Sequence, residues 1–385
     1  MASCKPLKFV KPPKEDMKRV LVLYFSGCIG FINDFNQTTE GLPTTDTKLY
    51  DFCRTDPTLN DINFLGPSLE SPAFCVLPAD QDQKMDRVAY LVHPYDKLMD
   101  SCNVCPAHWK TIAKDIQANY EDFDGFVLLH GNDTMAYTAS ALSFMLENLS
   151  KCLVITGSIK PIFDIRSDAK SNMKTAILIA GNYQIPEVTI FFRDRLLRGN
   201  RCIKRGADSF FAFDSLNVPP LLQMGFPMKE VDNLIKTPTK RCKLKIHAKL
   251  NPNVSFLRIY PGLPIQIMKA CFEVPIDGVV MQTYGLGNVP YDRTELIKLI
   301  KEAIDRGVII VNCTQCPTGA VMPVSIVGNG TLLEEMGVIF VSDMTAEAAI
   351  TKVMYVLSKK KLSLEEKKRM MSKSIRGEMT ERGSS

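Results

Sequence analysis

Residues 126–146 read Phe-Val-Leu-Leu-His-Gly-Asn-Asp-Thr-Met-Ala-Tyr-Thr-Ala-Ser-Ala-Leu-Ser-Phe-Met-Leu, and this stretch decides the fold. The apolar run at 126–129 predicts a buried strand, and the Ala-rich segment at 133–146 predicts a helix. Between them lies a tight turn that carries Asn132 and Asp133 at the start of the helix, where backbone N–H groups point outward. Strand, turn and helix in this order indicate an α/β protein.

The same alternation continues on both sides of this stretch. We expect strands at 20–25, 88–92, 126–129, 153–156 and 188–192, and helices at 107–116, 133–146 and 168–180. Their short connections predict a parallel sheet covered by helices on both faces. Ligands bind at the carboxyl ends of such strands, and residues 25–28 and 130–133 both follow a predicted strand.

The 385 residues suffice for two domains. We expect an N-terminal extension at 1–19, a domain with the active-site cleft at 20–225, a linker at 226–250 and a second α/β domain at 251–385. Prolines interrupt the periodicity near the linker. In the second domain we expect strands at 254–259, 278–282 and 308–311, a helix stopped by Gly307, and helices at 345–357 and after Ser363, where Glu366 completes a capping box. Residues 32–72 are rich in Asn, Asp, Thr, Gly and Pro, which predicts a loop or lid.

Composition excludes several classes of protein. Hydrophobic residues make up 45% of the chain and charged residues 23%, which is typical of a globular protein. No apolar run approaches the roughly 20 residues that span a bilayer. The N-terminus lacks the apolar core of a signal peptide, and the twelve cysteines are scattered. We therefore expect a cytoplasmic protein without a membrane segment.

Nucleic acid, metals and cofactors are not expected. The net charge is +5, but the basic residues between 236 and 249 alternate with apolar ones from 242 to 250, which predicts the solvated face of a strand. No aromatic residues are interleaved there for base stacking. The Cys-x-x-Cys pairs at 102–105 and 313–316 fall in different predicted domains, and the four histidines show no metal-ligand spacing.

Together with five further stretches, the turn at 130–134 resembles the type I L-asparaginases, amidohydrolases also described as asparaginase/lysophospholipases. These stretches are Leu196–Arg201, Ala212–Ser215, Gln282–Gly285, Asn312–Cys316 and Ile375–Glu378. The resemblance covers about Val20 to Thr380. It implies a two-domain type I L-asparaginase-like fold with parallel sheets flanked by helices, and a homodimer or homotetramer in which a neighbouring subunit closes the cleft. Animal members often continue into ankyrin repeats; this sequence ends at Ser385, so we expect a member without them.

The resemblance also implies a catalytic site built on two threonines, an aspartate and a lysine. The candidate catalytic residues are Cys28, Asn132, Asp133 and Lys204, with Cys28 and Asn132 at the two threonine positions. A thiol whose pKa is lowered is a stronger nucleophile than a threonine hydroxyl, but a small buried cysteine is equally compatible with position 28. The carboxamide of Asn132 binds polar groups and cannot relay a proton as a hydroxyl does. Asp133 and Lys204 are either catalytic or a pair kept because breaking it is costly.

Position 28 lies in Phe25-Ser26-Gly27-Cys28-Ile29-Gly30, where the family has Thr-Gly-Gly-Thr-Ile-Gly. Phe25 places a bulky ring where a small polar residue is usual. Ser26 replaces a glycine, and it would strain the turn if that glycine has a positive φ. Both changes bear on whether this turn can still place a catalytic nucleophile at position 28.

Substrate binding is better preserved in the sequence. Asp100-Ser101-Cys102-Asn103 resembles the family loop that holds the α-carboxylate of the substrate, and Asp133 matches the residue that contacts the α-ammonium group. We therefore expect Asp100, Ser101, Asn132 and Asp133 to bind L-asparagine or a similar small amino acid.

A candidate allosteric site follows from the resemblance to bacterial members that bind a second asparagine. Its residues here are Gln282, Asn288 and Cys316. Gln282 stands where the bacterial members have an arginine, and a glutamine cannot clamp a carboxylate with two charged bonds. This difference argues against regulation by asparagine.

Three functional hypotheses stay open at this point. The first is an L-asparaginase-like amidohydrolase with a diverged, slow active site, in which Cys28 replaces the threonine nucleophile. The second is a catalytically dead homologue that acts as an amino-acid-binding or partner protein. The third is an amidohydrolase or acyltransferase of altered specificity, whose pocket is reshaped by Phe25 and Asn132.

Overall fold

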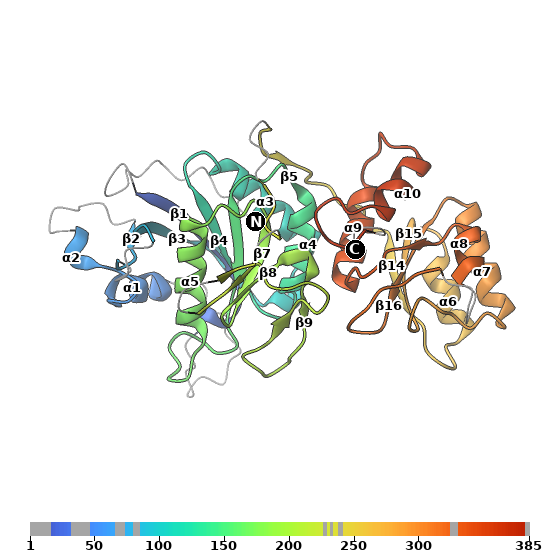
Figure 1. Ribbon diagram of the computed structural model, residues 1–385, viewed down its shortest axis with the longest axis horizontal. Coiled ribbons are helices and arrows are strands. Elements are labelled where there is room, and N and C mark those ends of the chain that lie inside the picture. Colours follow the sequence, from blue (N-terminus) through green and yellow to red (C-terminus); the bar gives the residue numbers. More distant parts are fainter. Residues whose placement is uncertain are drawn as a thin grey trace. The chain divides into compact units, whose positions relative to one another are not determined.

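The structure is a computed structural model that describes residues 17–31, 47–65, 74–79, 85–225, 229–231, 234–237, 242–323 and 330–381. The chain divides into two compact units (Figure 1). Unit 1 comprises residues 1–214 and 219–246, and unit 2 comprises residues 215–218 and 247–385. Both units are α/β, as the alternation of strands and helices predicts.

Unit 1 is built on a nine-stranded sheet of order β12-β11-β8-β7-β6-β4-β1-β3-β2. The strands are β1 Lys18–Ser26, β2 Cys75–Val76, β3 Val88–Met99, β4 Gly125–Leu129, β6 Cys152–Thr156, β7 Val188–Phe192, β8 Arg195–Arg198, β11 Leu222–Gln223 and β12 Lys229–Glu230. From β3 through β1, β4 and β6 to β7 all neighbours pair in parallel, which confirms the predicted parallel sheet. The pairs β2–β3, β7–β8, β8–β11 and β11–β12 are antiparallel, and the sequence did not predict these edges.

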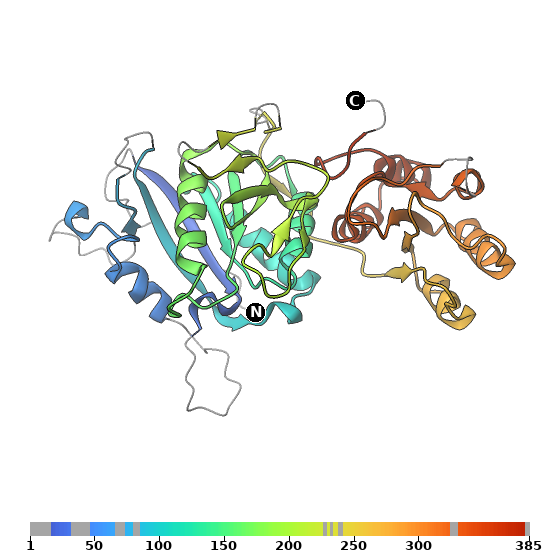
Figure 2. The same cartoon turned by 60° about the horizontal axis from the view of Figure 1, so that its bottom comes forward.

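Helices cover this sheet on both faces. They are α1 Thr47–Thr55, α2 Ile62–Leu65, α3 Pro106–Ala118, α4 Met135–Met145 and α5 Ala169–Asn182, with 3-10 turns η1 Cys28–Gly30, η2 Ser101–Asn103 and η3 Gly199–Arg201. Figures 1 and 2 both show α5 crossing the strands, and its Met173 and Ile177 share a core cluster with Val22 of β1. Leu21 and Leu23, on the other face of β1, are also fully buried. Burial on both faces explains the uninterrupted apolar runs of these strands.

Two sequence predictions for unit 1 need correction. Within 32–72, α1 and α2 are helices rather than loop, and residues 32–46 and 66–72 lie outside the described residues. The strand predicted at 242–250 is reduced to β13 Lys245–Ile246, which pairs with the equally short β5 Leu146–Glu147. Alternating polarity creates a strand only where a partner offers backbone groups, and β5 offers two residues.

Unit 2 contains a four-stranded parallel sheet, β14-β15-β16-β17. Its strands are β14 Val254–Arg258, β15 Gly278–Thr283, β16 Ile309–Thr314 and β17 Ile339–Phe340, and its helices are α6 Ile265–Phe272, α7 Thr294–Asp305, α8 Gly330–Met336, α9 Ala346–Leu357 and α10 Leu364–Ser372. Gly307 ends α7 with a φ of +90°, and Ser363 forms the predicted capping box with Glu366.

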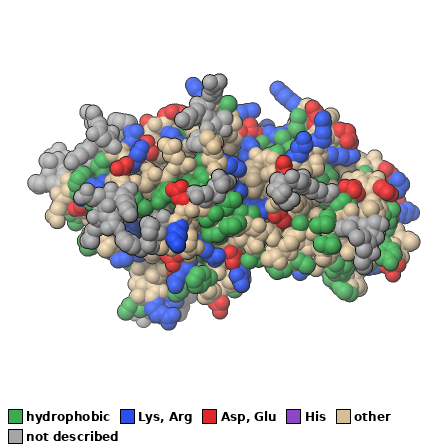
Figure 3. Space-filling view, in the orientation of Figure 1, with side chains coloured by type: hydrophobic (Ala, Val, Ile, Leu, Met, Phe, Trp, Pro, Cys, Tyr) green, Lys and Arg blue, Asp and Glu red, His purple; other side chains and the backbone are tan. Residues whose placement is uncertain are grey.

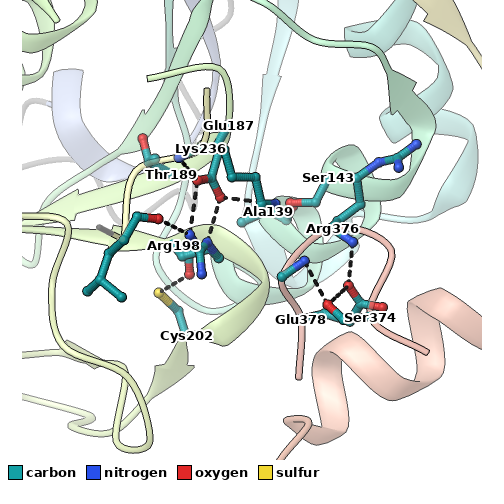
Figure 4. A network of polar contacts seen from close by, with 12 residues as sticks. Ala139, Ser143, Glu187, Thr189, Arg198, Cys202, Lys236, Ser374, Arg376 and Glu378 are labelled. Carbon is teal, nitrogen blue, oxygen red and sulfur yellow. Dashed lines mark hydrogen bonds and ion pairs between the residues drawn. The ribbon is translucent and has the colours of Figure 1, made fainter. Parts of the chain in front are cut away.

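A buried ion pair holds the end of unit 2. The ammonium of Lys352 lies 2.6 Å from a carboxylate oxygen of Glu378, and both side chains are fully buried. Backbone N–H groups of Ile375 and Arg376 donate to the same carboxylate, whose surroundings appear in Figure 4. A buried pair is stable only when its remaining donors and acceptors are satisfied in this way.

Two further findings bear on the predicted partners. Within the described residues, every helix is too short or too polar to cross a membrane. On the face drawn in Figure 3, acidic and basic side chains are interspersed rather than gathered into one basic surface. Proteins that bind nucleic acid collect their basic side chains on one face.

Candidate active site

Two turns lie side by side at the carboxyl ends of neighbouring strands. β1 and β4 pair in parallel up to Tyr24 and Leu129, so the residues that follow them meet at one edge of the sheet. The N–H of Gly131 donates to the hydroxyl of Ser26 at 3.0 Å. A Cβ added to Gly27 would come within 2.6 Å of the Cα of Gly131. The close approach of the two turns therefore requires glycine at position 27.

The left-handed residue of the first turn lies after Ser26. The left-handed residue is Gly27, with a φ of +96°, whereas Ser26 ends β1 and its hydroxyl accepts the bond from Gly131. Ser26 therefore does not strain the turn. The ring of Phe25 is 2% exposed and packs against the rings of Tyr95 and His108, with centroids 5.2 and 5.9 Å away. This ring fills part of the interior.

A buried chain of hydrogen bonds orients the second turn. The indole N–H of Trp109 donates to the hydroxyl of Thr138 at 2.9 Å, and that hydroxyl lies 2.9 Å from Nε2 of His130. Nδ1 of His130 lies 2.7 Å from the carbonyl of Gly131, which can only accept, so Nδ1 carries the ring proton and donates a hydrogen bond to that carbonyl. Nε2 of the neutral ring then accepts from the hydroxyl of Thr138. Burial lowers the pKa of His130 to about 4, so the ring is neutral near pH 7 and holds the turn.

Lys204 joins the second turn from a separate ladder. It lies in β9 Ile203–Lys204, which pairs with β10 Phe213–Asp214. Its ammonium donates to Oδ1 of Asn132 at 2.6 Å and to Oδ1 of Asp133 at 2.5 Å. Nδ2 of Asn132 donates to the carbonyl of Ser158 at 2.9 Å. The carboxamide thus uses both its donor and its acceptor inside the protein.

The loop predicted to hold the substrate carboxylate lies against the same turn. Ser101 is 2% exposed, and its carbonyl accepts from the hydroxyl of Thr134 at 2.7 Å. A Cβ on Gly131 would come within 2.5 Å of the Ser101 hydroxyl oxygen. Asp100 is exposed, and its carboxylate caps η2 by accepting from the N–H of Cys102. Ser101 therefore lies against the second turn, and Asp100 stabilises the loop that contains Ser101.

Cys28 opens η1 at the end of β1. The position of its side chain lies outside what the structure describes. Its neighbour Ile29 accepts a hydrogen bond from the N–H of Ile162 at 2.7 Å, which ties η1 to the segment after β6. Whether the thiol faces Lys204 stays a prediction.

The candidate allosteric residues gather at the carboxyl ends of the parallel strands of unit 2. Nε2 of Gln282 donates to the carbonyl of Thr314 at 3.4 Å, and the hydroxyl of Thr314 accepts from the N–H of Cys316. Asn288 pairs through its backbone with Tyr284. The sequence did not single out Arg258, whose guanidinium donates to Oε1 of Gln282 at 3.0 Å. The two residues face each other in the β14–β15 register, a relation visible only once the strands are paired.

Across the described parts of the chain, no three histidine, cysteine or acidic side chains are grouped so that they would hold a metal ion. The polar groups of this site are a lysine, a carboxylate, a carboxamide and a serine.

Comparison with known proteins gives concordant matches over both units. Residues 19–235 match the family described as Asparaginase, N-terminal, and residues 253–371 match the Glutaminase/Asparaginase C-terminal domain. Over 367 residues the chain is 44% identical to an L-asparaginase of Dirofilaria immitis, covering 94% of this chain and 60% of that protein. Over 291 residues it is 44% identical to L-asparaginase 1 of Escherichia coli K12, covering 76% of this chain and 85% of that protein.

A solved structure agrees with these matches. The crystal structure of L-asparaginase I from Vibrio cholerae superposes with a TM-score of 0.78 at 39% identity, and the match covers 94% of this chain and 99% of that one. The chain therefore spans a bacterial homologue almost completely, and 60% of the longer nematode protein.

Proposed function

The chain belongs to the asparaginase family, and from that premise we propose that it is an L-asparaginase-like amidohydrolase of low turnover. It converts L-asparagine and water to L-aspartate and ammonia. The observation that carries the proposal is the contact of Lys204 with both Asn132 and Asp133, beside Ser101. A cation, a carboxylate and a buried serine at one strand-end edge are suited to an amino acid with two charged groups.

Each residue has a role in this proposal. Ser101 holds the α-carboxylate of the substrate and Asp133 its α-ammonium group. The thiolate of Cys28 attacks the side-chain amide carbon, the C–N bond breaks, and ammonia leaves with the proton of the thiol. Water then cleaves the thioester and releases aspartate. The ammonium of Lys204 stabilises the negative charge that develops in both steps.

Low turnover follows from the chemistry of position 132. A threonine hydroxyl passes a proton on, whereas the carboxamide of Asn132 has no proton that it can give up near neutral pH. Its acceptor is bonded to Lys204 and its donor to Ser158. Groups that act as a unit in catalysis lose several orders of magnitude when one of them is replaced.

The alternative is a catalytically dead homologue that binds a small amino acid or acts as a partner protein. The bonds of the Asn132 carboxamide to Lys204 and Ser158 favour it, because the second turn then keeps a binding geometry without a group that moves a proton. Under either function we expect a cytoplasmic homodimer or homotetramer.

The decisive experiment is ammonia release from L-asparagine by the purified full chain. It is run beside Cys28→Ala, the double variant Cys28→Thr/Asn132→Thr, and Cys242→Ala as a control at an exposed cysteine. Turnover that is lost in Cys28→Ala and kept in Cys242→Ala supports a thiol-based asparaginase. No turnover in the native chain, with activity gained in the double variant, supports the dead homologue.

Calorimetry with L-aspartate separates binding from catalysis. Heat of binding without turnover of L-asparagine indicates an amino-acid-binding protein. The absence of both binding and turnover contradicts the asparaginase and the amino-acid-binding protein, and leaves the partner protein. A panel of amides and esters tests altered specificity, which is ruled out if none is cleaved faster than L-asparagine.

A further inference from the structure

We propose that Asp214 is a positioning residue for Lys204 and that it acts through two arginines, Arg195 and Arg205. The importance of this role for catalysis rests on the function proposed above, in which the ammonium of Lys204 lies at the reacting centre. The positioning itself is a property of the fold and is measurable without turnover.

The ladder that carries Lys204 is too small to hold itself in place. β9 and β10 pair over two residues each, Lys204 opposite Phe213 and Ile203 opposite Asp214, and they form a sheet of their own. A two-stranded pair of this size is not stable in water alone. The position of Lys204 therefore depends on contacts that anchor β9–β10 to the nine-stranded sheet.

Arg195 supplies that anchor from β8. Its Nη1 donates to Oδ1 of Asp214 at 2.9 Å, and its Nη2 donates to the carbonyl of Phe213 at 3.1 Å. One planar guanidinium thus binds two consecutive residues of β10, including the one opposite Lys204. β8 is paired on both sides, with β7 and β11, so the guanidinium projects from a fixed strand.

Arg205 completes the clamp from the residue next to Lys204. Its Nη1 donates to Oδ2 of Asp214 at 2.8 Å, so each oxygen of the carboxylate binds a different arginine. The side chain of Asp214 is 12% exposed, against 22% for Arg195 and 63% for Arg205. Solvent screens the Arg205 contact more strongly, so the Arg195 contact contributes most of the anchoring.

An apolar contact supports the same ladder. Phe213 is 1% exposed, and its ring lies 5.0 Å from the ring of Phe192 in β7. The ring contact holds β10 against β7, and the bond between the Asp214 carboxylate and Arg195 holds β10 to β8. Without the carboxylate, the ammonium of Lys204 would no longer be held within hydrogen-bond reach of Asn132 and Asp133.

The test measures Lys204 directly by competitive acetylation with acetic anhydride, with peptide masses read by mass spectrometry. Lys204 is 22% exposed and bonded twice, whereas Lys298 is 76% exposed and serves as the internal standard. We expect Lys204 to react roughly tenfold more slowly than Lys298 in the native chain, because charge-assisted hydrogen bonds must break first.

The variant Asp214→Asn removes the charge and keeps the shape of the side chain. We expect Lys204 to be acetylated about fivefold faster in it, while Lys298 is unchanged. The matched control is Asp61→Asn, because Asp61 also bonds an arginine, Arg87, at 2.5 Å with 22% of its side chain exposed, away from the β9–β10 ladder. The control should lower the melting temperature without changing the rate at Lys204.

Two further variants keep the proposal testable if Asp214→Asn fails to fold. Arg195→Lys keeps the charge and loses the planar fork, so it should also expose Lys204. Arg205→Gln changes an exposed side chain, and we expect about a twofold faster reaction. Unchanged acetylation of Lys204 in the folded variants overturns the proposal.

Turnover separates this proposal from the function it rests on. If L-asparagine is cleaved, Asp214→Asn should lower kcat about tenfold with KM within about twofold, because a misplaced catalytic group affects the chemical step. A second outcome is that the native chain shows no turnover of L-asparagine while Lys204 is acetylated faster in the variants. In that case the positioning role stands and the proposed function fails. If KM alone rises and the acetylation rate of Lys204 is unchanged, Asp214 acts on binding and the positioning role is wrong.

Discussion

The turns after β1 and β4 occupy equivalent places at adjacent strand ends, and the resemblance to the asparaginases implies that they differ from the family motifs to different degrees. The turn after β4 differs from the resembled family at Asn132 alone among its catalytic positions, and His130, Asn132, Asp133 and Thr134 all have hydrogen-bond partners. The turn after β1 differs at three of six positions, and it still has Gly27 with a φ of +96° and a bond to its neighbour. The comparison teaches that backbone shape and reactive groups are separable: glycine and hydrogen bonds hold the shape of the two turns, whatever side chains stand at positions 28 and 132.

The largest expected effect comes from breaking the contact between the turns. Gly27→Ala combines a left-handed backbone with a Cβ within 2.6 Å of Gly131, so we expect a loss of about 4 kcal/mol in the free energy of unfolding. Urea denaturation measures it. Gly262→Ala is the control, because Gly262 has a φ of +81° with open space around it, and it should cost about 1 kcal/mol. Equal losses would show that backbone conformation alone, and not the approach of the turns, constrains position 27.

The second largest effect is a dependence of stability on pH that comes from His130 in the turn after β4. The folded pKa of His130 is lowered from 6.5 to about 4, so below pH 6.5 the unfolded chain binds a proton that the folded chain does not. Stability is therefore lost as pH falls from 6.5 to 4, by about 3 kcal/mol from this group. His130→Gln keeps one donor and one acceptor and cannot titrate, so the urea midpoint of the variant should depend less on pH. Parallel pH curves for the two proteins would contradict the assignment.

A third prediction asks which turn limits catalysis. Because Cys28 keeps a nucleophile and Asn132 has no proton to relay, Asn132→Thr alone should raise the rate of ammonia release roughly a hundredfold, equivalent to about 2.7 kcal/mol. Cys28→Thr alone should give no gain. Initial rates with saturating L-asparagine decide between them, and a larger gain from Cys28→Thr would place the defect in the turn after β1.

The smallest expected effect isolates the hydrogen bond that joins the turns. Ser26→Ala leaves the buried N–H of Gly131 without its partner and should cost about 1.5 kcal/mol. Ser140→Ala is the matched control, since Ser140 is equally buried and its hydroxyl lacks a partner among the described residues. Thermal melting should show little change in the control. A similar loss in both variants would assign the effect to packing.

The sequence predicts the centre of the fold well and its edges poorly. The runs at 126–129, 153–156 and 188–192 are strands because parallel strands buried on both faces must be continuously apolar. The antiparallel turn from β7 into β8 was missed. Its residues, Arg193 and Asp194, have φ values of 43° and 63°. Turns of this left-handed geometry are predicted from Asn-Gly or Gly-Gly, and Arg-Asp gives no such indication.

The candidate site shows a similar limit. The turn at 130–134 could be predicted from the sequence because strand, turn and helix are contiguous in the chain. Lys204 and Asn132 are 72 positions apart, and their contact was expected only from the resemblance to a family. The resemblance included the stretch Ala212–Ser215, but the contact of Asp214 with Arg195 was not predicted, because β9 and β10 are too short to produce a periodic pattern.

The buried pair of Lys352 and Glu378 has a consequence for how the protein is made. Lys352 leaves the ribosome 26 residues before Glu378, and until then its ammonium has no carboxylate from position 378 to enter the core with. Burying it alone would cost several kcal/mol. The pair can therefore form only after Glu378 has been made, and a chain truncated before Glu378 leaves the ammonium of Lys352 without this partner.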